Sequence, residues 1–160
     1  SIRRTAALLV LSSTLGGSLA RAFSSQPATA HISSLVTPNV ILDKSRAEAN
    51  TKRMLERSGR LETTLRPHVK THKTVEGALM QTMGQRSTIT CSTLAEAEFF
   101  AAAGFTDIVY AVPIDPFKLE RAAKLAEHVH VTIDNVQQLD ELISYGPPSP
   151  GTKWSVVIMA

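Results

Sequence analysis

The sequence contains a single cysteine, Cys91, so it cannot form an intramolecular disulfide, which suits a reducing compartment. Cys91 lies in the strand-like run 88–93. Because free cysteines are usually buried, we expect an inert thiol rather than a catalytic nucleophile. The sequence also has no GxGxxG segment after any predicted strand, which weakens a dinucleotide-binding fold.

Acidic residues are absent from the first 42 positions, whose only basic side chains are Arg3, Arg4 and Arg21. The other 14 lysines and arginines are balanced by 14 aspartates and glutamates, so the body of the chain is neutral. The isoelectric point near 9.2 therefore comes from the amino-terminal segment. A neutral body lacks the basic surface that nucleic-acid binding requires, and we expect no nucleic-acid partner.

Residues 1–30 are predicted to be a targeting leader, because they carry arginine, are rich in serine and lack acids. The segment Arg21–Ser25 resembles a mitochondrial processing site, so mitochondrial localisation is the first expectation. An alternative stays open, since the apolar run 6–11 and the residues Ser18–Ala20 would also suit a secretory or plastid signal. The apolar run is too short to span a membrane, and we expect no membrane partner.

Residues 31–160 are long enough for one domain with a core, and they alternate between predicted strands and helices. The predicted strands are 40–42, 61–65, 88–91, 108–112, 128–133 and 154–159. Helices are predicted to begin at capping boxes (Ser45 with Glu48, Thr93 with Glu96, Asp134 with Gln137), near Val75 and at Asp115–Pro116. They are predicted to end near Gly59, Gly84, Gly104 and Gly146.

The predicted strand ends recur at an even spacing. They fall at Lys70, Ser92, Pro113 and Asp134, which are 22, 21 and 21 residues apart. Regular strand–helix units of this kind indicate parallel strands, in either a barrel or a doubly wound sheet.

The most specific segment is Arg66–Lys73, RPHVKTHK, which stands where a strand passes into a helix. Alternation along a strand would put Arg66, His68 and Lys70 on one face and Pro67 and Val69 on the other. A lysine crowded by cations loses its proton more easily and can then form Schiff bases. A solvated basic loop or a phosphate-binding patch is the alternative, but a surface patch does not need three basic groups on one face.

This octapeptide, the upstream TPxVILD (Thr37–Asp43) and the downstream TxxEAExFxxAGFxDI (Thr93–Ile108) resemble the D-serine dehydratase and D-threonine aldolase family. The resemblance runs from about residue 35 to the last residue. It implies an α/β fold, namely part of the (β/α)8 barrel of the alanine racemase N-terminal domain class. It also implies pyridoxal 5'-phosphate as cofactor, held by Lys70 and not by Lys73.

The resemblance further implies the reaction: D-serine would lose its β-hydroxyl and yield pyruvate and ammonia, with Lys70 taking the Cα proton. D-threonine aldolase or racemase activity is the alternative, and a non-catalytic pyridoxal-phosphate-binding protein or an inactive fragment is another. The family's full-length members imply a homodimer and zinc, but the residues that would bind zinc lie beyond residue 160. No metal ligands are predicted in this sequence.

The other candidate residues receive more modest roles. His68 is expected to touch the cofactor or lower the pKa of Lys70, or else to be a hydrogen-bonded core residue. Thr93 is expected to cap a helix, with a cofactor contact as a second role. Arg66 is expected to form a structural ion pair and Lys73 to be solvated. His128 and His130, along with Tyr110 and Trp154, are expected to be structural.

A complete barrel needs roughly 250 residues, whereas five barrel strands are predicted here after the early strand 40–42. We therefore expect this chain to be a fragment, or the product of a truncated gene model, that ends after about five barrel strands. We also expect such a fragment to be unstable alone, because it would leave strand edges unpaired.

Overall fold

The computed structural model describes residues 31–159 except Leu35, Thr37 and Asn39, so the predicted leader lies outside the described residues. The chain divides after Arg57 into two units, each described here by itself. Of the first unit the structure describes the short 3-10 helix η2 (Ile32–Ser34) and most of helix α1 (Lys44–Arg60). The barrel-like fold belongs to the second unit, from Ser58 on.

Helix α1 begins two residues earlier than its predicted capping box. Asp43, not Ser45, accepts the hydrogen bond from the backbone N–H of Arg46, and it also accepts one from the Ser45 hydroxyl. The strand predicted at 40–42 is wrong. Val40 is 91% exposed. No strand in the described part of the chain pairs with this segment, so its apolar residues have no ladder to join.

Four parallel strands form the sheet of the second unit, in the order β1-β2-β3-β4. They are β1 (Thr88–Cys91), β2 (Asp107–Pro113), β3 (Val129–Ile133) and β4 (Val156–Ile158). The predicted strands 88–91, 108–112 and 128–133 are confirmed within a residue, and the last one is shorter than predicted. Sequential order with parallel pairing is the pattern of successive βα units in a barrel.

The strand predicted at 61–65 is wrong, because hydrogen bonding to β1 starts only at Pro67. The Pro67 carbonyl accepts from Thr90 N at 2.9 Å, and Val69 N donates to the Thr90 carbonyl at 2.9 Å. These bonds make one isolated parallel bridge, between His68 and Thr90. Pro67 has no N–H to extend the ladder, which keeps the paired stretch short.

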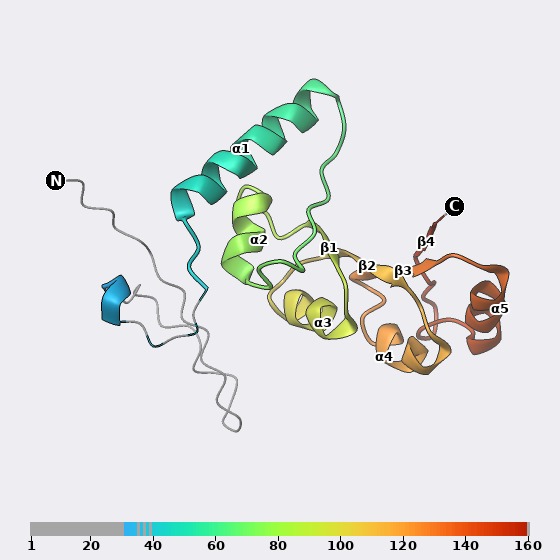
Figure 1. Cartoon of the computed structure of the whole chain (residues 1–160). Coiled ribbons are helices and arrows are strands. Elements are labelled where there is room, and N and C mark those ends of the chain that lie inside the picture. Colours follow the sequence, from blue (N-terminus) through green and yellow to red (C-terminus); the bar gives the residue numbers. More distant parts are fainter. Residues whose placement is uncertain (1–30, 35, 37, 39, 160) are drawn as a thin grey trace. The chain divides into compact units, whose positions relative to one another are not determined.

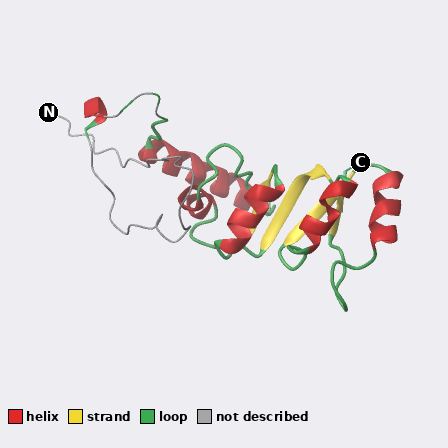
Figure 2. Cartoon of the chain, turned by 90° about the horizontal axis from the view of Figure 1, so that it is seen from below, coloured by secondary structure: helices red, strands yellow, loops and turns green. Residues whose placement is uncertain are grey.

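Helices line one side of this sheet. They are α2 (Val75–Gln81), α3 (Leu94–Ala102), the 3-10 turn η3 (Pro116–Lys118) with α4 (Leu119–Ala123), and α5 (Val136–Tyr145). Figure 1 shows α3, α4 and α5 below the strands, and Figure 2, the view from below, shows them in front. The core therefore lies between this helical layer and the sheet.

Side-chain caps start α2, α3, η3 and α5. Thr74, Thr93 and Asp115 accept hydrogen bonds from the backbone two or three residues on. The cap of α5 lies one residue later than predicted. Asn135 accepts from Gln138 N at 2.9 Å, while the Gln138 side chain accepts from Asp134 N at 2.9 Å. The pair resembles a capping box, except that Gln138 accepts from the N–H of Asp134, the residue before the cap Asn135.

Alternate strand residues are buried against the helices. The buried set includes Ile89, Cys91, Ile108, Tyr110, Val129, Val131, Leu94, Phe100, Phe105, Leu119 and Leu142. Phe100 and Phe105, both fully buried, meet edge to face with ring centroids 5.4 Å apart. Burying each such ring contributes about 2 kcal/mol. Most of the intervening strand residues, on the opposite face, are half-buried and include the polar side chains of the site, whereas Thr132 is fully buried and Val112 is exposed.

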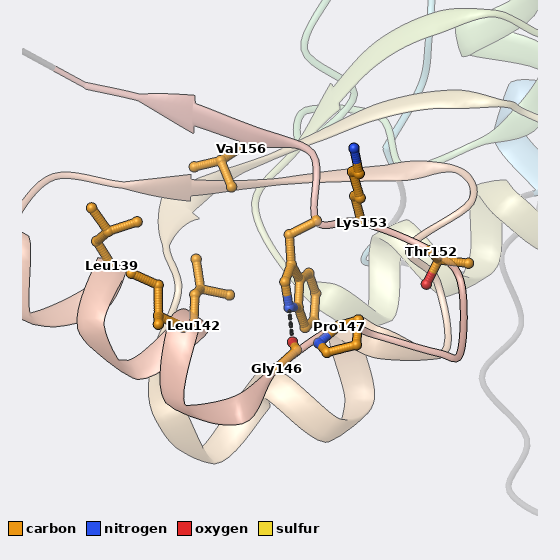
Figure 3. A pocket seen from close by; sticks show the side chains of 9 residues that line it. Leu139, Leu142, Gly146, Pro147, Thr152, Lys153 and Val156 are labelled. Atoms are coloured by element: carbon orange, nitrogen blue, oxygen red, sulfur yellow. Dashed lines mark hydrogen bonds between the residues drawn. The ribbon is translucent and has the colours of Figure 1, made fainter.

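The indole of Trp154 connects α5 to the approach of β4. Its Nε1–H donates to the Gly146 carbonyl at 2.7 Å (Figure 3). The ring also meets Tyr145 edge to face. Around it lies an apolar pocket of about 320 Å³, lined by residues of α5, the following loop and β4. None of the predicted site residues lines this pocket.

The thiol of Cys91 is fully buried, as predicted, and burial followed by the nearby charge of Glu96 raises its pKa to about 12. We expect the native protein to resist alkylation by iodoacetamide at neutral to mildly alkaline pH, because the reactive thiolate is scarce there. Denatured protein should react at the rate of a free thiol. Peptide mass spectrometry of both states tests this, and rapid labelling of the native form would contradict it.

Candidate active site around Lys70

The alternation predicted for the lysine motif is confirmed. Pro67 and Val69 are buried, Arg66 and His68 are half-buried, and Lys70 is exposed. Because side chains alternate along an extended chain, Arg66, His68 and Lys70 share the face away from the helices. The motif thus presents its basic groups on the polar face of the sheet, next to β1.

The Lys70 side chain is exposed and, among the described residues, its ammonium group has no hydrogen-bond or ion-pair partner. Its backbone is held, since Lys70 N donates to His68 Nδ1 at 3.2 Å. An amine on an anchored backbone, without a carboxylate partner, is available to react. The arrangement leaves the amine accessible to a carbonyl compound such as a cofactor aldehyde.

The His68 ring lies between Lys70 and the end of β1. Its Nδ1 accepts from Lys70 N, which assigns the proton of the neutral ring to Nε2, 3.4 Å from Ser92 Oγ. Burial, followed by the positive charge of Lys70, lowers the pKa of His68 against the opposing effect of Glu96. His68 is therefore predominantly neutral near pH 7.

Arg66 forms the predicted structural ion pair, and its partner is Asp107 on β2. Its guanidinium donates to both Asp107 carboxylate oxygens, at 2.7 and 3.1 Å. His130 Nε2 lies 2.7 Å from Asp107 Oδ1, and His130 Nδ1 lies 2.6 Å from Ser155 Oγ. This chain of contacts links the lysine motif to β2, β3 and the approach of β4, which confirms a structural role for His130.

His72 packs onto helix α2. Its Nδ1 accepts from Thr74 N at 3.1 Å and its Nε2 lies 2.9 Å from Gln81 Oε1. The ring passes so close to Gly77 that a Cβ atom there would lie 2.5 Å from His72 Nδ1. Because Gly77 has no side chain, the His72 ring can pack against α2, and this contact holds one side of the loop after Lys70.

Lys73 is 59% exposed, yet it is not simply solvated as predicted, because its Nζ lies 3.1 Å from Oε1 of Glu96. The other oxygen of Glu96 accepts from Ser92 N at 2.8 Å. Glu96 is 7% exposed. Burial would raise its pKa, but the Ser92 N–H and the Lys73 charge outweigh burial and lower it. The capping box with Thr93 marks Glu96 in the sequence, but nothing in the sequence predicts its pairing with Lys73.

Thr93 caps α3, as predicted: its Oγ1 accepts from Glu96 N at 3.1 Å. Accepting this bond leaves its own O–H free to donate, so the cap and a contact with an anionic ligand are compatible.

Substituting Gly77 with alanine is expected to lower stability by about 1–2 kcal/mol, because the new methyl group displaces the His72 ring and breaks its contacts. Gly59→Ala is the matched control. Gly59 lies in α1, where a Cβ atom would meet nothing within 4 Å, so alanine's helix preference should stabilise the protein by about 0.5–1 kcal/mol. Denaturant unfolding of both variants tests this. If Gly77→Ala stabilised the protein as much as Gly59→Ala, the close contact between Gly77 and His72 would be contradicted.

Residues 42–159 match the alanine racemase N-terminal domain family, and the chain belongs to that family. The match includes the lysine motif, all four strands and the network around Asp107. The predicted fold class, part of an α/β barrel with a parallel sheet, is confirmed.

Individual relatives agree with this assignment. The chain is 40% identical over 115 residues to D-threo-3-hydroxyaspartate dehydratase of Delftia sp. strain HT23, covering 70% of this chain and 30% of that protein. It is 36% identical over 138 residues to D-serine dehydratase of Dictyostelium discoideum, covering 79% and 35%. The solved structure of the Delftia enzyme superimposes with a TM-score of 0.72 at 38% identity, covering 78% and 34%. The chain thus spans about a third of the length of these relatives.

Proposed function

We propose that the full-length protein is a pyridoxal-phosphate-dependent lyase of D-amino acids, in which Lys70 holds the cofactor. The observation that carries the proposal is the free Lys70 amine on an anchored backbone. Support comes from the relatives, two of which are dehydratases of D-amino acids.

The residues present fit pyridoxal phosphate. Lys70 would hold it covalently, His68 stands beside Lys70 with a donor at Nε2, and the Thr93 hydroxyl has a proton free for an anionic group. When bound, the cofactor supplies an electron sink for carbanion chemistry.

The chemistry of this chain's own residues is that of an amine acting first as nucleophile and then as base. Lys70 shares its face of the sheet with Arg66 and His68. The Nζ atom then accepts the Cα proton of the substrate. A mainly neutral His68, whose Nδ1 accepts from the Lys70 backbone N–H, keeps a donor at Nε2 without adding a positive charge.

D-serine is the proposed substrate, with loss of its β-hydroxyl giving pyruvate and ammonia. Retro-aldol cleavage of D-threonine and racemisation are the alternatives, and non-catalytic cofactor binding is the second function. The test uses full-length protein saturated with pyridoxal phosphate and offered D-serine, D-threonine, D-threo-3-hydroxyaspartate and L-serine separately. Pyruvate from D-serine but not L-serine is the expected result. Glycine from D-threonine would favour the aldolase, and cofactor binding without any product would favour the non-catalytic function.

We also propose that the full-length protein binds zinc, forms a homodimer and resides in mitochondria. The zinc proposal is supported by the solved structure of a variant of the Delftia enzyme in a metal-free form, because this description implies that the same relative also has a metal-bound form. Within the described part of this chain, no group of three His, Cys, Asp or Glu side chains could hold one. No helix there is long and apolar enough to cross a membrane.

Deleting residues 1–23 is expected to leave the activity of the purified protein unchanged and to move the protein to the cytosol, because targeting segments do not join the fold. Fluorescence microscopy of tagged full-length and deleted forms checks this. Secretion or glycosylation of the intact form would contradict mitochondrial localisation.

A further inference from the structure

The loop that follows Lys70 adopts a conformation that needs external support. Lys73 has φ 51°, in the left-handed region that a lysine rarely occupies. Its backbone N–H donates to the Val69 carbonyl at 2.9 Å. A tight turn of this kind persists only when its surroundings hold it, and the side-chain contacts of His72 and Lys73 supply that support.

Glu96 supplies the support on the side of α3. Its side chain is buried, and its Oε1 is paired with the Lys73 ammonium, 3.1 Å away. Its Oε2 is held by Ser92 N, at the end of β1. The carboxylate thus joins the loop after Lys70 to the strand that pairs with the lysine motif.

The charge of Glu96 is not explained by helix capping. A glutamine in the same position of a capping box can accept the same backbone hydrogen bond. Burying a carboxylate is costly unless it is paired, and the pairing cation here is Lys73. The ion pair with Lys73, which fixes the loop after Lys70, therefore explains the negative charge of Glu96, whereas the start of α3 does not.

We propose that Glu96 is a positioning residue for Lys70, which fixes the loop Lys70–Lys73 by pairing with Lys73 and with Ser92 N. This inference rests on the proposed function of Lys70. His72 holds the same loop from the side of α2, so Lys70 stands at the start of a turn that is clamped from two helices. The rigid turn places the free amine reproducibly, which is what attachment of a carbonyl cofactor requires.

The test compares full-length protein carrying Glu96→Gln, Lys73→Gln or both with a control, Glu98→Gln. Glu98 lies on the same helix but pairs with Arg121 at a more exposed site, 41% exposed. Two readouts are taken from protein purified without cofactor. One is hydrogen exchange of the Lys73 and Thr74 amides, and the other is the rate at which added pyridoxal phosphate becomes fixed to Lys70 by borohydride, followed by peptide mass spectrometry.

We expect Glu96→Gln and Lys73→Gln each to speed exchange at Lys73 and slow attachment at Lys70 by about tenfold, with no further change in the double variant. Glu98→Gln should match the wild type. A folded Glu96→Gln protein with wild-type exchange and attachment would overturn the proposal. If Glu96→Gln does not fold, Lys73→Gln decides alone, because its side chain is exposed.

The outcomes separate this inference from the proposed function. If borohydride fixes no cofactor to Lys70 in the wild type, the proposed function fails. Exchange at Lys73 and Thr74 then still decides whether Glu96 holds the loop. If attachment occurs but is the same in all variants, the proposed function stands and the positioning role fails.

Discussion

Replacing Lys70 with alanine in the full-length protein is expected to abolish covalent attachment of pyridoxal phosphate and to lower turnover of D-serine by at least about 1,000-fold. The reason is that no other lysine of the motif has a free amine. Lys73 is paired with a buried carboxylate, whereas the Lys70 ammonium has no partner among the described residues. Attachment is measured by borohydride fixation and mass spectrometry of the peptide that carries both lysines.

Two controls distinguish chemistry from structure. Lys73→Ala should slow attachment but leave it at Lys70, and Lys70→Arg should keep the positive charge while abolishing attachment. Because Lys70 is exposed and unpaired, Lys70→Ala should change the free energy of unfolding by less than about 0.5 kcal/mol. Fixation of the cofactor to Lys73 in the Lys70→Ala protein would show that the wrong lysine has been assigned.

Local rules are enough to predict most of the second unit. Three strands are predicted within a residue because each combines an apolar or β-branched run with a capped helix after it, as at 88–91 and Thr93. The alternation at Arg66–Lys70 is likewise predictable, because it depends only on the geometry of an extended chain. The ion pair of Arg66 is predictable as a type of contact, but not with its partner, Asp107.

The errors arise where pairing decides the structure. The runs 40–42 and 61–65 have strand-like residues, but a strand exists only where a neighbour offers a ladder. The predicted capping boxes at Ser45 and Asp134 are off by one or two residues, because neighbouring polar residues compete for one cap. The contacts of Glu96 with Lys73 and of Gly77 with His72 join turns to helices, so residue spacing gives no indication of them.

The ion pair between Arg66 and Asp107 is expected to contribute about 2 kcal/mol to stability, so Asp107→Ala should lower the free energy of unfolding by that amount. The value lies between those of exposed and buried pairs, since the two side chains are 32% and 36% exposed. The loss leaves a half-buried guanidinium without its carboxylate and also removes the acceptor of His130. Glu98→Gln, at the more exposed pair with Arg121, should cost less than about 1 kcal/mol.

The same pair predicts how stability depends on pH. Hydrogen bonds from Arg66, then from His130, hold the pKa of Asp107 below its usual value of 3.8 against the effect of burial. A carboxylate with a lowered pKa in the folded state stabilises fully above its unfolded pKa, and this contribution disappears as the pH falls through the folded pKa. Urea unfolding between pH 7 and pH 2.5 should therefore show the wild type and the Asp107→Asn variant converging as the pH drops below about 3.8. A constant difference across that range would mean that the charge of Asp107 does not contribute, and that only its shape holds Arg66 in place beside the lysine motif.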